Sequence, residues 1–500
     1  MPFIDQLQHW ARTSGQHTAV VVGKQRLTFA QLLDSATSAT APAQTVDVID
    51  EPTGTALAVR FCAAVNSGTP AMVLDAQWPP GLRRQLGDAA QEWGTRSPDK
   101  PAGDPAFLLG LSSGTSGLPK AFTRSSSSWR ESFARSVEYF GLTGQSVTLA
   151  PGPLAASMNL YALAESIYAG STFTALPHFS TAAALTAMRE HNVTRLVVVP
   201  TVLALLAGAG LRTEQPGRQL TSIVCAGSAL SAGAVALARE WAPNAAIQQY
   251  YGAAELGFVA ASRIPPGGAA ASADSGVGSA FPGAQISIRN SQGLPVANGI
   301  AGAIYVRSPY VCGGYAWGDD GLAFSSLAAN APWRTEGPDP SDPDAGEWFT
   351  VHDQGQLDGA GRLHVLGRAS DLVIVAGANV YPHAVEAALT AAVGTTAAGP
   401  HATVVVTGHG DALRGQRLVA GLHVGEGTGS RIAAGLVAGT MDAGEVLAVC
   451  RLAAAKLPAH HRPSQYYVLD ALPMTGSGKI SRAIFTQWLS EGDPRARRLH

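Results

Sequence analysis

Alanine-rich apolar helices alternate with short β-branched runs over most of the first 360 residues. The helix TALAVRFCAAVNSG at 55–68 precedes PAMVLDA, TAAALTAMREHNV precedes TRLVVVPT, and SAGAVALAREWAP precedes AAIQQYYG. A helix followed by a buried strand is the repeating unit of a largely parallel sheet with both faces covered. This alternation predicts an α/β body, and it restricts the fold more than any other feature of the sequence.

The composition changes along the chain, and 500 residues are enough for two domains. The tract 261–301 is rich in Gly, Ala, Ser and Pro and contains QISIRN and AIYVRS, which predicts a β subdomain. Residues 332–347 hold four prolines and many acids, so we expect a surface loop there. Strands are expected at 402–407, 416–424 and 464–469, with helices at 382–392 and 441–456. We therefore predict domains at 1–369 and 370–500, the second a small α+β unit.

Charge and hydropathy exclude several classes of protein. The net charge is −2 and charged residues make up only 14% of the chain, so no basic excess exists for binding a nucleic acid. Apolar stretches are interrupted before they reach membrane-spanning length. The amino terminus carries Asp5 and has neither a signal nor a transit pattern, so a cytoplasmic location is expected. Cysteines 62, 225, 312 and 450 are widely spaced, which argues against disulfides and a zinc site.

The segment LLGLSSGTSGLPKAF has the composition of a polyphosphate cradle. Small residues expose consecutive backbone N–H groups, hydroxyls add donors, and a lysine supplies positive charge. A buried strand, FLLGL, leads into it and a helix, WRESFARSVEYF, follows, so a flexible linker is disfavoured. The spacing differs from GxxxxGK[ST], which indicates a different phosphate loop. The predicted phosphate-binding residues are Ser112, Ser113, Gly114, Thr115, Ser116, Gly117 and Lys120.

Three further segments carry groups suited to a nucleotide, although each has a plain structural interpretation when taken alone. QYYGAAE at 249–255 offers a glycine for close approach, aromatic faces for a purine and a carboxylate for Mg²⁺, but it also fits a strand end with a core tyrosine. Asp353 in WFTVHDQG has a carboxylate that can accept from vicinal hydroxyls, or it can cap a turn. Lys479 lies on a Gly-flanked loop, where lysines are usually solvated.

Seven segments in a fixed order make the chain resemble the adenylate-forming superfamily of acyl-CoA synthetases, amino-acid adenylation domains and luciferases, with acyl-CoA synthetases nearest. They are the phosphate loop, CAGSAL at 225–230, QYYGAAE, AGAIYVRSPYVCGGY at 301–315, WFTVHDQG, the stretch GRLHVLGRASDLVIVAGANVYPHAVEAAL, and PMTGSGKISR at 473–482. The resemblance covers about residues 15–485. It implies a large amino-terminal body of α/β and β subdomains and a small, mobile carboxy-terminal domain, with the active site between them.

The resemblance also assigns roles to residues at matching positions. Lys479, Lys120 and Glu255 would be catalytic, with Glu255 and Thr115 at the Mg²⁺ ion. Tyr251 would stack on adenine, Gln249 would read its edge, and Asp353 would hold the ribose. The remaining nucleotide contacts would come from Gly227, Ser228, Tyr250, Gly252 and Arg368. Ser370 would be the hinge between the domains, and Gly377 would line the coenzyme A tunnel.

Two alanines depart from the family pattern beside the reacting centre. Ala156 stands where a histidine is usual, and Ala254 where a threonine or serine is usual. With Ser157 and Asn159 they form the predicted acid pocket. The aspartate with which amino-acid adenylation domains pair an α-ammonium group is missing, so α-amino acids are disfavoured. We expect an unusual acid, either bulky or branched, or a non-carboxylate oxyacid.

The function that the resemblance implies is ATP-dependent adenylation of an organic acid, followed by transfer to coenzyme A. ATP, Mg²⁺ and coenzyme A are the expected cofactors, a small-molecule acid is the expected partner, and the chain is expected to be a monomer or homodimer. Two alternatives stay open. One is an enzyme on the same fold that activates an oxyacid such as nitrite, as diazotases do, or that ligates an acid to an amine or carrier protein. The other is a nucleotide-binding protein without turnover.

Overall fold

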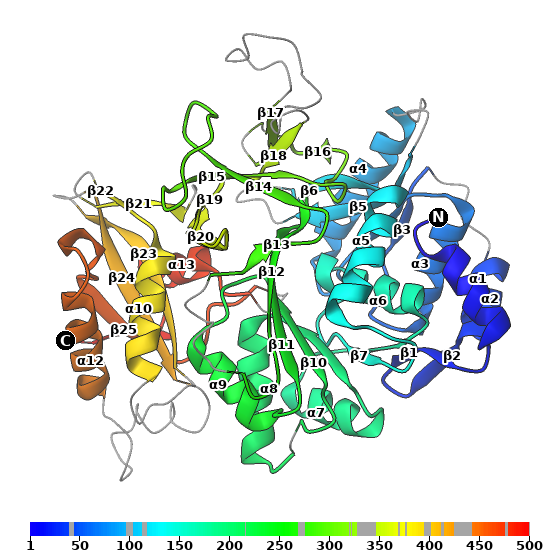
Figure 1. The fold of residues 1–500 in the computed structure, drawn as a ribbon, viewed down its shortest axis with the longest axis horizontal. Helices are drawn as coiled ribbons and strands as arrows, with labels where there is room; N and C mark the ends of the chain where they lie inside the picture. The colour runs from blue at the N-terminus through cyan, green and yellow to red at the C-terminus, as the bar shows by residue number, and fades with distance from the viewer. Residues whose placement is uncertain are drawn as a thin grey trace.

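The computed structural model describes residues 1–39, 45–96, 104–112, 118–215, 217–268, 276–319, 321, 323–327, 347–368, 371–375, 378–394, 402–411, 415–424, 443–475 and 479–499. Within these ranges the strands form four sheets (Figure 1). Five residues of the predicted phosphate loop, at 113–117, lie outside the described residues, as do Ser370 and Gly377.

The largest sheet is the one that the helix–strand alternation predicts. Its nine strands run in the order β13-β12-β11-β10-β9-β7-β8-β1-β2. The six from β11 to β1 pair in parallel, whereas β2, β12 and β13 join antiparallel at the two edges. The bounds are β1 (Thr18–Val22), β2 (Gln25–Thr28), β7 (Val147–Leu149), β8 (Thr172–Ala175), β9 (Arg195–Val198), β10 (Ser222–Ala226), β11 (Ala246–Ala253), β12 (Gly257–Ile264) and β13 (Ser279–Ala280).

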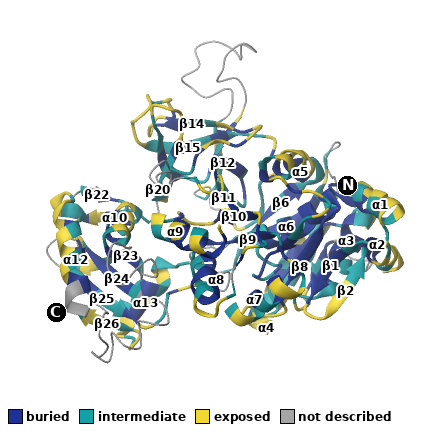
Figure 2. Cartoon of the chain, turned by 60° about the horizontal axis from the view of Figure 1, so that its bottom comes forward, coloured by how far each residue is buried: buried dark blue, intermediate teal, exposed yellow. Residues whose placement is uncertain are grey.

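Helices cover both faces of this sheet. Successive side chains of its strands point to opposite sides, and because both sides are apolar, both must be covered. Val197 and Val224 belong to a core shared with α1 (Ile4–Thr13), α2 (Phe29–Ser38), α3 (Thr55–Ser67), α5 (Ser126–Phe140) and α6 (Ser157–Ala169). Their neighbours Ile223 and Cys225 belong to a second core with α7 (Thr181–Glu190), α8 (Pro200–Arg212) and α9 (Ala232–Trp241). Figure 2 shows the central strands as the most buried part of this three-layer body.

A five-stranded sheet carries both ends of the predicted phosphate loop. It consists of β3 (Asp47–Ile49), β4 (Ala71–Val73), β5 (Ala106–Ser112), β6 (Lys120–Ser125) and β16 (Tyr315–Trp317), in the order β16-β6-β5-β4-β3, and α4 (Pro80–Arg96) packs beside it. In the antiparallel pair β5–β6, Ser112 lies opposite Lys120. The two residues that bracket the loop are therefore held side by side.

The β subdomain is present, but its boundaries differ from those predicted. Residues 261–264 belong to β12 of the largest sheet, because they pair with β11. The subdomain is an antiparallel sheet that reaches Arg368 and contains β14 (Gln285–Arg289), β15 (Gly302–Arg307), β17 (Ser325–Leu327), β18 (Trp348–Thr350), β19 (Asp353–Leu357) and β20 (Leu363–Arg368). Of the predicted surface loop at 332–347, only Glu347 is among the described residues.

The carboxy-terminal part forms a separate α+β unit, drawn in yellow to red in Figure 1. It has its own hydrophobic core of strand and helix residues. Its elements are β21 (Val373–Val375), β22 (Ala378–Val380), α10 (Pro382–Gly394), β23 (Ala402–Asp411), β24 (Gly415–Val424), α12 (Ala443–Ala455), η4 (Ala459–His461), β25 (Gln465–Leu469), α13 (Arg482–Glu491) and β26 (Ala496–Leu499). The predicted fold class is confirmed. The division at residue 370 stays a prediction, although the β subdomain ends at Arg368 and this sheet begins at Val373.

The sequence argues against disulfides and against a membrane-spanning segment. All four cysteines are buried and free of disulfides. No helix in the described ranges combines the length and apolar character needed to cross a bilayer.

One buried ion pair joins α6 to the centre of the largest sheet. Arg195 Nη2 lies 2.7 Å from Glu165 Oε2, and the two side chains are 4% and 1% exposed. Removing one partner of such a pair leaves an uncompensated buried charge. We expect Arg195→Met to lower the free energy of unfolding of the amino-terminal body by about 3–5 kcal/mol, measured by urea denaturation.

The matched control is Arg497→Met. Arg497 pairs with Asp470 at 3.0 Å, and both side chains are 48% exposed. Its loss should cost no more than about 1 kcal/mol. Equal effects of the two substitutions would contradict the role given to the buried pair.

Candidate active site

Strand β11 presents alternate residues of QYYGAAE to opposite sides of the largest sheet. On one side, the Gln249 Nε2 donates to the Gly276 carbonyl at 3.3 Å, and Tyr251 reaches the β subdomain. On the other, the Tyr250 ring lies 4.7 Å from that of Phe258, among core aromatics. Gln249 and Tyr251 thus share one face, as their predicted adenine contacts require. Tyr250, also predicted to bind the nucleotide, packs in the interior of the body.

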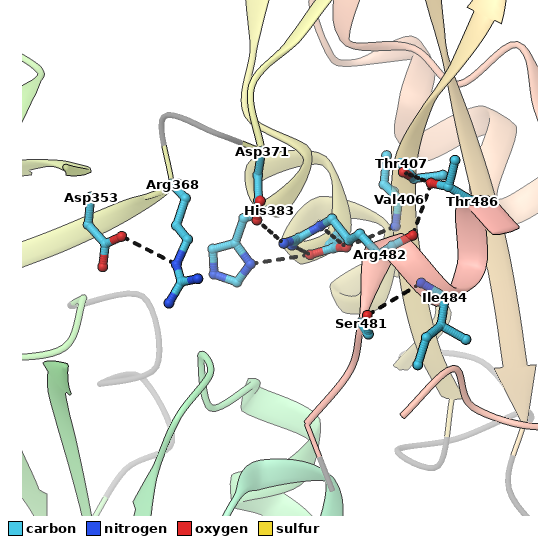
Figure 3. Close-up of polar contacts among 11 residues, drawn as sticks. Asp353, Arg368, Asp371, His383, Val406, Thr407, Ser481, Arg482, Ile484 and Thr486 are labelled. Carbon is cyan, nitrogen blue, oxygen red and sulfur yellow. Dashed lines mark hydrogen bonds and ion pairs between the residues drawn. The ribbon is translucent and has the colours of Figure 1, made fainter. Parts of the chain in front are cut away.

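Tyr251, Asp353 and Arg368 form a chain of polar contacts at the edge of the β subdomain. The Tyr251 hydroxyl donates to Asp353 Oδ2 at 2.6 Å. On the other side of this carboxylate, Arg368 Nε lies 3.6 Å from Asp353 Oδ1, as Figure 3 shows. Burial raises the pKa of Asp353, and contacts with Tyr251 and Arg368 only partly oppose this. Asp353 Oδ1 is buried and accepts no hydrogen bond from any residue that the structure describes. A ribose hydroxyl is a donor that this oxygen can accept, so the residue fits the predicted role.

Glu255 is held by two contacts that the sequence analysis did not predict. Its carboxylate Oε1 accepts from the Tyr315 hydroxyl at 2.8 Å, and its backbone carbonyl accepts from the Cys312 N–H at 2.7 Å. Burial, followed by the charge of Glu255, raises the pKa of Tyr315. Tyr315 ends the segment AGAIYVRSPYVCGGY, one of the seven that carry the family resemblance, to which no site residue was assigned. Its signal in the sequence was the Gly-Tyr pair that ends this segment.

Tyr315 also connects Glu255 to the ends of the phosphate loop. The Lys120 Nζ lies 5.8 Å from the centroid of the Tyr315 ring, and the nearby Ser112 side chain partly opposes the rise in the pKa of Tyr315. Proteins commonly bind Mg²⁺ through one or two carboxylates, and phosphate oxygens of the substrate and waters supply its other ligands. Glu255 near the two described ends of the loop fits that arrangement, and no group of three or more metal-binding side chains occurs in the described part of the chain.

Lys479 reaches this region from the carboxy-terminal domain. Its loop is closed by an antiparallel bridge between Met474 and Ile480, and the Lys479 N–H donates to the Thr475 Oγ1 at 3.2 Å. Burial, together with the nearby charge of Arg368, lowers the pKa of the Lys479 ammonium, and the charge of Glu255 opposes this. The structure therefore brings Lys479, Arg368 and Glu255, from three separate motifs, into one electrostatic neighbourhood.

Gly227 makes room for the lysine. A Cβ atom at this position would lie 2.9 Å from Lys479 Cε, and the backbone φ of +92° favours glycine. The segment CAGSAL, predicted to contact the nucleotide through Gly227 and Ser228, thus also packs against Lys479. Ser228, predicted to contact the nucleotide, is exposed.

The predicted acid pocket contains few free polar side chains. Ala156 is the N-cap of α6 and makes no side-chain cap. The Asn159 Nδ2 is committed to the Pro153 carbonyl at 2.9 Å, and Ser157 is half-buried. The Ala254 carbonyl accepts from the buried Arg124, which also donates to Tyr310. Sequence reasoning missed Arg124, because an arginine within a strand near the phosphate loop carries no motif signal.

Comparison with known proteins places the chain in a family. The sequence profile described as AMP-binding enzyme matches residues 45–316. The uncharacterised acyl-CoA ligase YhfT of Bacillus subtilis is 30% identical over 85% of this chain and 76% of its own length. The indoleacetate–CoA ligase of Aromatoleum aromaticum is 28% identical over 80% of this chain and 70% of its own.

A solved structure covers the whole chain. The o-succinylbenzoate CoA synthetase (MenE) of Bacillus subtilis, bound to its acyl-adenylate intermediate, superposes with a TM-score of 0.73 at 22% identity, over 100% of this chain and 99% of that one. The chain belongs to the AMP-binding enzyme family. It is an ATP-dependent, AMP-forming ligase.

The position of Lys479 leads to a kinetic prediction. Loss of a preorganised charge at a site where negative charge develops costs on the order of 10²–10³ in rate. We expect Lys479→Ala to lower the rate of adenylate formation by about this factor while ATP affinity changes little, as measured by single-turnover assays and ATP titration. Lys456→Ala, at an exposed lysine just after α12, is the control and should behave as wild type.

The same lysine should make the reaction sensitive to alkali. Its pKa is below the ordinary 10.5, and only the protonated ammonium can neutralise phosphate, so kcat/KM for ATP should fall as pH rises through the lowered value. In Lys479→Arg this alkaline limb should disappear, because a guanidinium stays charged. An identical limb in both proteins would assign it to another group.

Proposed function

We propose that this chain couples a small organic acid to coenzyme A in two steps at one site. In the first, a carboxylate oxygen attacks the α-phosphorus of ATP, the bond to the bridging oxygen breaks, and pyrophosphate leaves. In the second, the thiol sulfur of coenzyme A attacks the acyl carbon, AMP leaves, and the thiol proton passes to solvent. The convergence of Lys479, Arg368, Asp353 and Glu255 around one site is the observation that carries the proposal.

Each of these side chains suits one part of the first step. Asp353 would accept from the ribose through Oδ1, which accepts no hydrogen bond from the described residues. Arg368 and Lys479 would offset negative charge on the α-phosphate and the incoming carboxylate. Glu255, oriented by Tyr315, would hold Mg²⁺, which would draw charge from the phosphates. Tyr251 and Gln249 lie on the face of β11 where adenine contacts would form.

Coenzyme A as acceptor is supported by the names of the relatives. Two of them, one 30% and one 28% identical over most of this chain, are named as CoA ligases. For the second step, we propose that the carboxy-terminal domain rotates about Ser370 and withdraws Lys479, so that a tunnel beside Gly377 can open. This would let one site carry out two reactions in sequence.

The experiment that tests the function is ATP–pyrophosphate exchange with a panel of acids that includes nitrite. We expect exchange that depends on a carboxylic acid, followed by release of AMP and a thioester when coenzyme A is added. Exchange with nitrite alone would overturn the carboxylate proposal in favour of a diazotising enzyme. Product formation only with an amine or carrier protein would change the acceptor, and no exchange with any acid would support a nucleotide-binding protein without turnover.

The two alanines of the acid pocket lead to a specificity prediction. Ala156 and Ala254 leave space and remove a hydrogen-bonding group beside the reacting centre, so we propose an acid whose own atoms occupy that space. Loss of one net hydrogen bond weakens binding by about 0.5–1.5 kcal/mol. In Ala156→His the imidazole would take up the space that we assign to the acid. Activity on the best acid of the panel should therefore fall while ATP affinity is retained, as measured by kcat/KM for each substrate. A gain of activity toward that acid would show that the gap plays no part in substrate choice.

A further inference from the structure

Arg482, three residues beyond Lys479, binds two carboxylates at once. It is the first residue of α13, whose N-cap Ser481 accepts from the Ile484 N–H through its Oγ. Its Nη1 donates to Asp371 Oδ2 at 2.9 Å, while its Nε and Nη2 donate to the two oxygens of Glu386 at 3.2 and 2.5 Å (Figure 3). A forked, charge-assisted contact of this kind fixes orientation as well as distance.

The Glu386 end of this contact is itself anchored in the carboxy-terminal sheet. Its Oε1 also accepts from the Val406 N–H at 2.9 Å, and its Oε2 lies 3.3 Å from His383 Nδ1. Burial alone would raise the pKa of Glu386, but the contacts with His383, Arg482 and Val406 outweigh it and lower the pKa. One turn further along α13, the hydroxyls of Thr486 and Thr407 are 2.8 Å apart. Glu386 is therefore a fixed point to which α13 is tied.

The Asp371 end lies on the segment that joins the two domains. Asp371 comes three residues after Arg368, whose guanidinium is 3.6 Å from Asp353 in the nucleotide site. The charge of Asp371 is close enough to Asp353 to raise the pKa of that carboxyl, in addition to the larger effect of burial. Arg482 lies just after the loop that carries Lys479, which we call the catalytic-lysine loop. Its contact with Asp371, 111 positions earlier, joins this loop to the start of the carboxy-terminal domain.

We propose that Arg482 is a positioning residue that sets the catalytic-lysine loop relative to the interdomain segment, so that Lys479 enters the nucleotide site in register with Arg368. The contacts of Thr475 with Lys479 and of Ser481 with Pro473 close the loop on itself, whereas Arg482 reaches out of it to Asp371. We call the contacts of Arg482 with Asp371 and Glu386 the clamp. Through them, the position of residue 371 constrains the position of residue 479. This assignment rests on the proposed function, because it deepens the account of adenylate formation.

A double-mutant cycle with Lys479 tests this assignment. Misplacing a catalytic group by about 1 Å can cost on the order of 10²-fold in rate, so Arg482→Gln should slow adenylate formation by about 10- to 100-fold at unchanged ATP affinity. In the Lys479→Ala background the same substitution should have almost no further effect, because the lysine it positions is absent. Equal losses in both backgrounds, or no loss in the wild-type background, would overturn the proposal.

Milder variants keep the test decisive if Arg482→Gln does not fold. Arg482→Lys retains the charge, but an ammonium cannot bind both carboxylates in the geometry of a guanidinium. Asp371→Asn weakens only the contact with Asp371. Both variants should therefore show part of the loss in the rate of adenylate formation. Arg497→Gln, at the exposed pair with Asp470 in the same domain, is the matched control and should leave the rate unchanged.

Hydrogen exchange separates failure of the clamp from failure of the proposed function, because it needs no substrate. In Asp371→Asn we expect faster exchange of the amides at 479–484 than in wild type, with no change in β24. Unchanged exchange at 479–484 would overturn the clamp, whatever the activity. An absence of acid-dependent exchange in the wild-type ATP–pyrophosphate assay would instead overturn the proposed function.

Discussion

The site depends on a lysine ammonium that one domain buries against another. Lys479 lies beside Gly227 of the amino-terminal body, near the like charge of Arg368 and the opposite charge of Glu255. Burial and a neighbouring cation both disfavour the charged form, so the ammonium is held at an electrostatic cost. A polyphosphate is the ligand that offsets such a cost. Binding of the nucleotide and docking of the carboxy-terminal domain are therefore expected to favour each other.

The body supplies the other half of the site by bringing three sheets together. The largest sheet carries Tyr251 and leads into Glu255, the five-stranded sheet carries Lys120 and Tyr315, and the β subdomain carries Asp353. Buried Arg124 donates to the carbonyls of Ala254 and Tyr310, which fixes the turn before Glu255 against the segment before Tyr315. The Glu255 carboxylate is thus oriented by Tyr315, and the turn before it by Arg124, and precise electrostatic stabilisation requires such fixed orientation.

The acid pocket has the weakest sequence signal of any part of the site, for a physical reason. Nucleotide recognition uses charged and hydrogen-bonding groups that leave recognisable motifs, whereas an acid pocket is shaped mainly by the volume of apolar side chains. Solved structures of this fold at about a fifth identity share its architecture, and architecture alone does not select a substrate. Ala156 and Ala254 are informative because each removes a group rather than adding one.

The sequence by itself determined the fold class and, in the carboxy-terminal part, three strands and two helices, although it did not predict β21, β22, α13 or β26. It also singled out the segments to which we assign the nucleotide chemistry. Hydrophobic periodicity is local, so the helix–strand alternation predicted the parallel sheet, and the expected strand at 464–469 was found at Gln465–Leu469. Contacts between distant segments have no such local signal. Only the tertiary structure decided that residues 261–264 join the largest sheet, that Tyr250 turns into the core while Tyr251 meets Asp353, that Tyr315 holds Glu255, and that Arg482 bridges Asp371 and Glu386. Strand register and side-chain geometry settle these pairings, and both depend on how the whole chain packs.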